Sequence, residues 1–477
     1  MDELRITLLG FGSANRALAR MLLSKSVPYP TSKSPSSQEE GRTLCLRAVG
    51  GRSGSIGDDG SGVRLVPWRI VSIVTRRHGR VCVPLRIHDT TTSNDAPHWE
   101  IDLEMALHRV ESGGILDRSV VTNNQYPSGE TNDDIQWHGI ADQLTNADET
   151  LQLISQLGQS NTSNIVVEAI PSNTKGDGEP AISFIAMALQ SKMHVVSANK
   201  VPLAHTCCSD DGEGGGFEDT YWKLQQLAQS NNVTYQHESA VMDGVPLFSL
   251  WKYALPHTTV TSIRGCLNST TTMILSRMEG SIDDEDNRFD DVGGESFHDA
   301  LIAAKEMGIV EEDDSLDLDG YDAAVKLRAL LVVLSSTTLT STFNETGTAT
   351  VPTMDEISRD SIRNISAEDI GNAYSNGRKK YRLVASARLL DVPTNMEQDQ
   401  GAENDGCRSC CLSKRWEASV QLQLLSPSDP LYNLRGTDSA IQFSTDVMGS
   451  VTVVSSNPTL VDTAYGLYSD IVRVACA

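Results

Sequence analysis

The chain has 477 residues, enough for two or three domains with a sizeable core. Its formal net charge of −24 argues against a broad surface for nucleic acid or anionic membranes. The sequence shows neither the roughly 20 consecutive apolar residues of a membrane span nor a basic, apolar leader, so we expect a cytoplasmic protein with no nucleic-acid or membrane partner.

Strands and helices alternate through the first half of the chain, which predicts a parallel sheet. A continuous apolar run such as 164–170 is typical of a strand that is buried on both faces. The expected elements are, in order, strand 5–9, helix 15–25, strand 69–75, a helix around 140–157, strand 164–170, helix 179–191, strand 194–198, helix 220–230 and strand 233–238.

Three polar stretches interrupt this pattern and are interpreted as inserts. Residues 26–62 are rich in Ser, Gly and Pro, and we expect them to be mobile and dispensable. Residues 89–150 are polar and irregular, and 208–219 contain a flexible glycine-rich run.

The second half alternates less regularly and predicts helices first and strands later. A further insert near 392–414 contains Cys407, Cys410 and Cys411, which we interpret as free thiols because no second cysteine pair completes a zinc site. The expected elements are a helix after Pro246, strand 259–265, helices 269–279, 296–307, 320–336 and near 366–376, strands near 380–390, 416–425, 439–445 and 449–455, and a helix over 462–475.

A glycine-containing loop joins the first strand to the first helix, the position of a Rossmann phosphate loop. It consists of Gly10, Phe11, Gly12, Ser13, Ala14 and Asn15. Gly10 permits a tight turn, and Gly12 lets the backbone approach a pyrophosphate at the helix N-terminus. Asn15 stands where the pattern has a third glycine or alanine. The alternative is an ordinary strand-to-helix turn.

The end of the second strand bears on which dinucleotide is bound. NAD-type sites often carry an acidic residue there, but this strand is followed by Arg76 and Arg77. Guanidinium groups bind a 2′-phosphate bidentately, which favours NADP(H) over NAD(H). A solvated basic turn is the alternative.

An acidic segment precedes a lysine in the second half of the chain. Asp322 and Lys326 are four residues apart and form an i, i+4 pair if a helix begins near Gly320. Taken alone, the segment is typical of a solvated acidic loop followed by a helix with one ion pair.

Several motifs, in order, resemble the homoserine dehydrogenase family, and specifically its short monofunctional form without an aspartate kinase domain. The motifs are VVEAIPSNTKGDGEPA (166–181), HVVSANKVPLA (194–204), YQHESAVMDGVPLF (235–248), GCLNSTTTMIL (265–275), SFHDALIAAKEMGIVEEDDSLDLDGYDAAVKLRAL (296–330) and DTAYGLYSDIV (462–472). The resemblance implies an NAD(P)H-dependent reversible reduction of L-aspartate 4-semialdehyde to L-homoserine, in threonine, methionine and isoleucine biosynthesis.

The resemblance also implies an α/β fold with two parts and a homodimer formed through a sheet. A Rossmann NAD(P)-binding domain would cover 1–245 and be completed by 456–477. An α+β catalytic and dimerisation domain with a mixed sheet would cover 246–455.

By resemblance, two lysines would act at the reaction centre. Lys326 would exchange a proton with the substrate oxygen, and Lys200 would face both nicotinamide and substrate. Glu311 would hold the substrate ammonium, which discriminates amino acids from plain alcohols. The other implied contacts are Asp317, Asp322 and Thr270 for the substrate, and Ile170, Pro171 and Gly308 for the cofactor.

The resemblance further implies a loop that binds a monovalent cation, Na⁺ or K⁺, mainly through backbone carbonyls. The matching residues are Glu238, Val241, Asp243 and Val245, and oxygen donors suit such a hard cation. The alternative is a structural loop in which Glu238 is hydrogen-bonded.

Three places depart from the family's glycines: Asn15, Ser269, and Ser455 to Thr459 in place of a G-x-G-A-G run. Side chains there would crowd a cofactor, and backbone angles reserved for glycine would be lost. The alternatives are therefore a catalytically weak NADP-binding protein of the same fold, or a reductase of another small amino-aldehyde.

Overall fold

The computed structural model describes residues 3–30, 40–47, 63–83, 99–123, 146–208, 217–256, 258–280, 294–307, 309–310, 314–337, 349–393 and 412–476. The chain divides into two compact units. Unit 1 comprises Met1–Pro202, Trp222–Pro246 and Thr459–Ala477, and unit 2 comprises Leu203–Tyr221 and Leu247–Pro458. The chain thus leaves unit 1 twice and returns to it at Trp222 and, for the C-terminal helix, at Thr459.

Unit 1 is built on an eight-stranded sheet with a parallel centre. The strand order is β12-β9-β8-β1-β4-β3-β2, and β5 pairs with β4. The first five strands in this order run parallel, while β2, β3 and β5 are antiparallel to their neighbours. The strands are β1 (Leu4–Leu9), β2 (Val27–Pro30), β3 (Glu40–Arg47), β4 (Val63–Val74), β5 (Arg80–Cys82), β8 (Ile165–Glu168), β9 (His194–Ser197) and β12 (Tyr235–Gln236), with β6 (Trp99–Ile101) and β7 (Val121–Asn123) as a separate pair.

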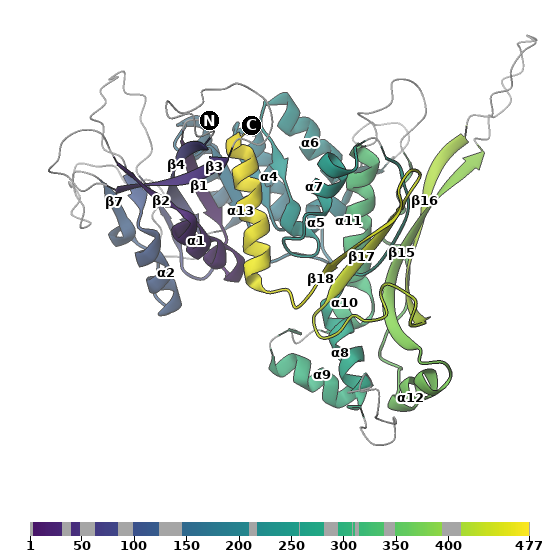
Figure 1. Ribbon diagram of the computed structural model, residues 1–477. Coiled ribbons are helices and arrows are strands. Elements are labelled where there is room, and N and C mark those ends of the chain that lie inside the picture. The colour runs from purple at the N-terminus through teal and green to yellow at the C-terminus, as the bar shows by residue number, and fades with distance from the viewer. Residues whose placement is uncertain are drawn as a thin grey trace, which may run out of the picture. The chain divides into compact units, whose positions relative to one another are not determined.

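Helices flank this sheet, and the first and last helices of the chain lie side by side (Figure 1). The C-terminal helix α13 is amphipathic, and its apolar face is buried in unit 1. The helices are α1 (Ser13–Lys25), α2 (Leu103–Glu111), η1 (Arg118–Val120), α3 (Ala147–Gln159), α4 (Ala181–Gln190), η2 (Glu238–Ala240) and α13 (Leu460–Cys476), with α5 (Val201–Ala204) and α6 (Thr220–Ser230) at the points where the chain passes between units.

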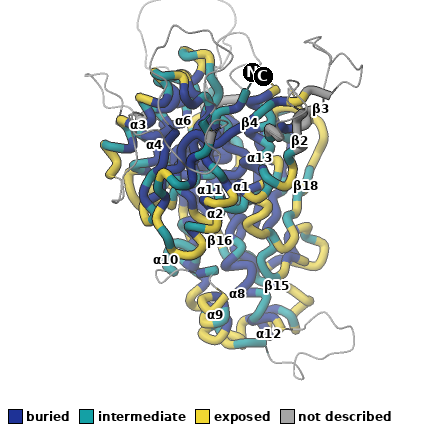
Figure 2. Tube along the Cα trace, turned by 90° about the vertical axis from the view of Figure 1, so that its left-hand side faces the viewer, coloured by how far each residue is buried: buried dark blue, intermediate teal, exposed yellow. Residues whose placement is uncertain are grey.

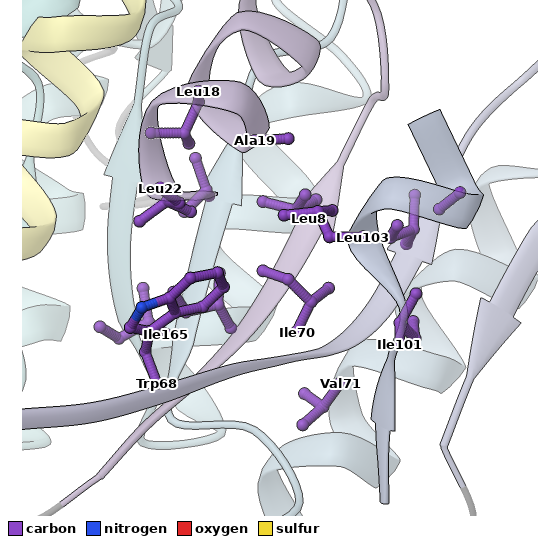
Figure 3. Packing of buried hydrophobic residues seen from close by; sticks show 14 of the residues in the cluster. Leu8, Leu18, Ala19, Leu22, Trp68, Ile70, Val71, Ile101, Leu103 and Ile165 are labelled. Carbon is purple, nitrogen blue, oxygen red and sulfur yellow. The ribbon is translucent and has the colours of Figure 1, made fainter. Parts of the chain in front are cut away.

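The core of unit 1 lies between the sheet and its helices. Leu8 and Ile70, from β1 and β4, contribute to the same cluster as Leu18 and Leu22 of α1 (Figure 3). Trp68 belongs to this cluster too, and its indole Nε1 donates a hydrogen bond of 2.8 Å to Ser26 Oγ. This packing of helices on the central strands holds the ends of these strands in fixed positions.

Two predicted inserts contain strands or a helix, so the prediction that they are irregular was wrong for these parts, whereas the prediction that 26–62 is dispensable stays a prediction. Within 26–62, β2 pairs with β3 and β3 pairs with β4, and Leu44 is fully buried. Within 89–150, α2 is an amphipathic helix whose N-cap Asp102 accepts a hydrogen bond from the Met105 N–H. Both elements gain their stability from distant partners, which local composition does not reveal. The rest of these inserts lies outside the described residues.

Unit 2 contains a six-stranded mixed sheet in the order β14-β16-β15-β13-β17-β18. Only the β14–β16 pairing is parallel. The strands are β13 (Val260–Cys266), β14 (Ser358–Arg359), β15 (Lys380–Pro393), β16 (Leu412–Leu425), β17 (Ser439–Thr445) and β18 (Gly449–Ser455). A separate pair, β10 (Thr206–Cys208) and β11 (Phe217–Asp219), flanks the predicted glycine-rich insert.

Helix α11 is buried on nearly all sides, whereas α9 and α12 keep exposed faces (Figure 2). None of the helices in the described ranges is long and apolar enough to cross a membrane. Residues 394–411, with the three clustered cysteines, lie outside the described part of the chain. The helices are α7 (Leu247–Ser249), the π-helix η3 (Leu250–Ala254), α8 (Ser269–Glu279), α9 (Phe297–Glu306), α10 (Ser315–Leu318), α11 (Tyr321–Thr337) and α12 (Ala367–Ser375).

Candidate active site

The turn after β1 requires glycine at its first position. Gly10 has a φ of +78°, and a Cβ at this position would lie 2.7 Å from the Ala169 carbonyl oxygen. The Gly10 N–H donates to the Val74 carbonyl at 2.8 Å. The loop is therefore fixed between the ends of the two strands that neighbour β1.

The next glycine leaves the start of α1 open. Gly12 is the N-cap residue and provides no side-chain cap, and a Cβ there would meet no atom within 4 Å. Ser13 is exposed and Ala14 is half-buried, while Phe11 packs into the core. Backbone N–H groups at an uncapped helix start suit a phosphate group, so the loop fits a dinucleotide.

Asn15 takes the place of the third glycine without crowding the turn. Its side chain is buried, and Nδ2 donates to the Leu9 and Gly10 carbonyls at 3.2 and 2.5 Å. The amide thus ties the helix to the end of β1 by hydrogen bonds instead of close packing. A glycine is not required for helix and strand to meet here.

The turn after β4 presents two arginines and no carboxylate. Arg76 and Arg77 are exposed, and the turn closes through the Thr75 N–H, which donates to the Gly79 carbonyl at 2.9 Å. Thr75 Oγ1 also accepts a hydrogen bond from the His78 N–H at 2.7 Å. The two arginines therefore lie on a hydrogen-bonded turn that follows β4. This strand pairs with β1, which leads into the glycine loop.

The carboxyl ends of β8 and β9 carry the other predicted cofactor contacts. Ile170 is half-buried and Pro171 is exposed after β8, and Lys200 is half-buried after β9. Sequence reasoning missed Glu168, which is fully buried at the end of β8, where burial raises the pKa of its carboxyl. A carboxylate inside an apolar strand was the available signal.

The acidic segment of unit 2 surrounds Lys326. The Lys326 Nζ lies 2.9 Å from Asp322 Oδ2 and donates to the Leu267 carbonyl, also at 2.9 Å. Asn268 Nδ2 donates to Asp322 Oδ2 at 3.0 Å and to Asp317 Oδ1 at 2.7 Å. One lysine, one amide and two carboxylates therefore form a single hydrogen-bonded cluster.

Asn268 has two roles in this cluster, and sequence reasoning did not identify either. Its Oδ1 accepts the Thr271 N–H at 2.8 Å, which caps α8, while its Nδ2 holds both carboxylates. The cap leaves Ser269 in the first helical position and Thr270 buried in the first turn. Thr270 thus lies at a helix N-terminus, where a carboxylate is stabilised.

Two other acids in the described part of the segment are engaged in other ion pairs. Asp314 pairs with Lys305 at 2.7 Å and with Arg363 at 2.6 Å, and Asp319 pairs with Arg363 at 3.0 Å. The hydrogen bond from Lys305, with that from Arg363, lowers the pKa of Asp314. These acids hold the loop, whereas Asp317 and Asp322 belong to the cluster. Gly308 and Glu311 lie outside the described residues.

The predicted cation loop contains a buried ion pair. Glu238 is buried, its Oε2 lies 2.8 Å from Arg473 Nη1, and its N–H donates to Asp470 Oδ2 at 2.8 Å. Asp243 has a φ of +58° and accepts a hydrogen bond from Thr463 Oγ1 at 2.9 Å. The Glu238 carboxylate is thus committed to Arg473, and backbone carbonyls remain as the donors that suit a hard cation.

Val241 and Val245 offer only backbone oxygens to such a cation, with Val241 buried and Val245 half-buried. In the described part of the chain, no group of three or more His, Cys, Asp or Glu side chains is arranged to hold a metal ion. Burial raises the pKa of the neighbouring Asp470 to about 7.

The segment in place of the G-x-G-A-G run keeps one glycine-like conformation. Asn457, at the middle glycine position, has a φ of +49°, and its N–H donates to Asp438 Oδ1 at 2.9 Å. Asparagine tolerates this left-handed region better than most residues. The chain thus keeps a left-handed residue in this segment, and whether the other glycine positions crowd a cofactor stays a prediction.

A glycine loop at the carboxyl edge of a parallel sheet fits a dinucleotide, and a lysine beside carboxylates fits proton transfer, a combination that an NAD(P)-dependent oxidoreductase requires. Residues 246–472 match the family model of homoserine dehydrogenase. Over this range the chain is similar to the homoserine dehydrogenase family.

Curated relatives are similar to this chain in sequence, and solved structures are similar to it in fold. The NAD(+)-dependent homoserine dehydrogenase of Pseudomonas canavaninivorans is 29% identical over 65% of this chain and 70% of the relative. The homoserine dehydrogenase of Methanocaldococcus jannaschii is 28% identical over 65% of this chain and 72% of its own. A structure of a putative homoserine dehydrogenase from Archaeoglobus fulgidus shares the fold, with a TM-score of 0.58, 19% identity and 99% coverage of both chains.

A second solved structure, a hyperthermophilic archaeal homoserine dehydrogenase in complex with NADPH, has a TM-score of 0.57 at 22% identity and covers 99% of this chain and 98% of that chain. At this level of identity the likeness bears on the fold alone. It supports the mixed α/β architecture of a Rossmann-type unit with a second, sheet-containing unit.

Proposed function

We propose that the protein catalyses the reversible reduction of L-aspartate 4-semialdehyde to L-homoserine with NAD(P)H. The observation that carries this proposal is the cluster of Lys326, Asp322, Asn268 and Asp317, at the positions of the family's substrate motif. Unit 1 is the nucleotide-binding domain, and unit 2 is the catalytic and dimerisation domain.

The glycine loop is the proposed site for the dinucleotide pyrophosphate, with Gly10, Phe11, Gly12, Ser13, Ala14 and Asn15 around it. When bound, the nicotinamide supplies a hydride to the substrate carbonyl carbon. The exposed pair Arg76 and Arg77 favours a 2′-phosphate and thus NADP(H) over NAD(H). A relative named as NAD(+)-dependent makes this preference a point to test in this chain.

Lys326 is the proposed proton donor to the substrate oxygen. An ammonium that is held by a carboxylate and a carbonyl has a fixed direction. As hydride arrives at carbon, the oxygen gains negative charge, which the ammonium stabilises before it transfers a proton. In the reverse direction the neutral amine takes the proton back from the alcohol.

Different residues are proposed to bind the ammonium and the carboxylate of the substrate. Glu311 binds the ammonium, and Thr270, at the N-terminus of α8, binds the carboxylate. Asp317 and Asp322 orient the substrate and Lys326. On the cofactor side, the proposed contacts of the nicotinamide end are Lys200, Ile170, Pro171 and Gly308.

We also propose a bound monovalent cation and a homodimer. A monovalent cation binds the loop of Glu238, Val241, Asp243 and Val245 through backbone carbonyls. The protein is a homodimer formed through the sheet of unit 2, which size-exclusion chromatography with light scattering tests directly.

The reaction is tested by NADPH oxidation with L-aspartate 4-semialdehyde. Succinate semialdehyde is a matched control, because it has the same carbon chain and lacks only the amino group. We expect turnover of the first and a much lower kcat/KM for the second. Equal kcat/KM for both would contradict recognition of an ammonium, and no turnover of either would contradict the proposed reaction.

A further inference from the structure

A chain of side-chain hydrogen bonds joins the carboxyl ends of β8 and β9 in unit 1. It starts at Glu168, the last residue of β8, whose side chain is fully buried. One carboxylate oxygen, Oε2, accepts the Ser197 hydroxyl at 2.5 Å, and the other, Oε1, accepts the Ile170 N–H at 2.9 Å. One carboxylate thus reaches both of the loops that follow these strands.

The chain continues around Lys200. Ser197 Oγ accepts the Asn199 N–H at 3.0 Å. Asn199 Oδ1 then accepts the Val201 N–H at 3.1 Å and the Ser172 hydroxyl at 2.8 Å. The residues on both sides of Lys200 are therefore held by buried side chains, and the loop that carries it is tied to the 170–172 loop.

The glycine loop is part of the same arrangement. The Ala169 N–H donates to the Leu9 carbonyl at 3.0 Å, and the Ala169 carbonyl is the atom that excludes a Cβ at Gly10. The ends of three neighbouring parallel strands, β1, β8 and β9, are thus connected. Ligands of doubly wound sheets bind at such an edge.

We propose that Glu168 is a positioning residue, which fixes the Lys200 loop through Ser197 and Asn199 and the 170–171 loop through the Ile170 N–H. The inference rests on the proposed function, because it assigns these loops to the nicotinamide end of the site. Burying a carboxylate is unfavourable unless its oxygens are hydrogen-bonded, and each Glu168 oxygen accepts a bond from a different loop. The hydrogen bonds of this carboxylate therefore hold the segments after β8 and β9 in place and add little to the packing of the core.

The test compares two buried serines at opposite edges of the same sheet. Ser197→Ala removes the link between Glu168 and Asn199. Ser163→Ala is the matched control, because Ser163 is also buried and donates to backbone carbonyls, at 3.0 Å to Arg5 and at 3.1 Å to Ile165, but it precedes β8 at the amino edge. Both variants are assayed for kcat, KM, thermal unfolding and amide hydrogen exchange of residues 198–201.

We expect both variants to lose similar thermal stability, and only Ser197→Ala to lower kcat, by about tenfold or more, since small displacements of a reacting group cost up to about 10²-fold. Its KM for the aldehyde should change much less, and exchange at 198–201 should become faster. A kcat for Ser197→Ala that equals that of Ser163→Ala would overturn the proposal.

A second variant covers the case in which Ser197→Ala does not fold. Glu168→Gln preserves volume and one acceptor oxygen, but it cannot accept from both loops, so it should lower kcat in the same way. A folded Glu168→Gln protein with wild-type kcat would overturn the inference. Absence of turnover in the wild-type protein would instead contradict the proposed function, so the two failures are distinguishable.

Discussion

Replacing Asn268 separates its role as a helix cap from its role as a donor to two carboxylates. Asn268→Ala removes both, and Asn268→Ser keeps a good N-cap residue while removing the amide donor. The cap is worth about 1 kcal/mol. Each of the two lost hydrogen bonds to a charged acceptor is worth about 1.5–3 kcal/mol. With the cap, Asn268→Ala should therefore cost about 4 kcal/mol or more.

For a unit of this size, about 1 kcal/mol corresponds to about 2–4 °C in Tm, so Asn268→Ala should lower Tm by about 8–16 °C. Asn268→Ser should lower Tm less than Asn268→Ala does, and the difference between the two variants is the contribution of the cap. Both variants should lower kcat by about tenfold or more, because Asp322, the partner of Lys326, loses its second anchor. Thermal unfolding by circular dichroism and steady-state kinetics measure these effects.

Two results of the comparison between Asn268→Ala and Asn268→Ser would contradict this reasoning. If Asn268→Ser keeps the wild-type kcat, the amide does not orient the cluster. If Asn268→Ala and Asn268→Ser have the same Tm, the Oδ1 cap of α8 contributes nothing measurable. Either result would contradict the reasoning from the observed hydrogen bonds.

Three other predictions follow from particular residues. Arg77→Ala should lower kcat/KM for NADPH and leave that for NADH nearly unchanged; equal effects on both would remove the 2′-phosphate assignment. Leu44→Ala should destabilise the protein by about 2–5 kcal/mol, because Leu44 is fully buried in β3, and an unchanged Tm would show that β3 is not part of the core. Burial raises the pKa of Glu168, so the folded protein binds this proton more tightly than the unfolded chain, and stability falls as pH rises through the folded-state pKa. The Tm of the wild type relative to Glu168→Gln should therefore increase as pH is lowered, and a pH-independent difference would contradict the raised pKa.

Local sequence predicted the parts of the site that depend on local geometry. The turn at Gly10 and the start of α1 follow from a short apolar strand, two glycines and an amphipathic helix, all within 25 residues. The pair of Asp322 and Lys326 likewise follows from helical spacing, and the structure has it at 2.9 Å.

Contacts between distant segments were not predictable in the same way. Asn268 is an unremarkable N-cap in sequence, and its bonds to Asp317 and Asp322 span 49 and 54 residues. Strand β3 was hidden in a Ser-, Gly- and Pro-rich stretch, because its stability comes from pairing with β4. The sequence shows Glu168 as an acid at the end of an apolar strand, but it does not show the partner from β9 that the carboxylate binds.

The central claim is that Lys326 transfers the proton to an amino-aldehyde, and its most direct test compares two lysines of the same region. Lys326→Ala removes the ammonium of the cluster, whereas Lys305→Ala removes only the ion pair with Asp314. In NADPH oxidation with L-aspartate 4-semialdehyde, we predict that Lys326→Ala lowers kcat by at least about 10²-fold, while Lys305→Ala stays close to the wild type. A folded Lys326→Ala protein with the kcat of Lys305→Ala would contradict the account.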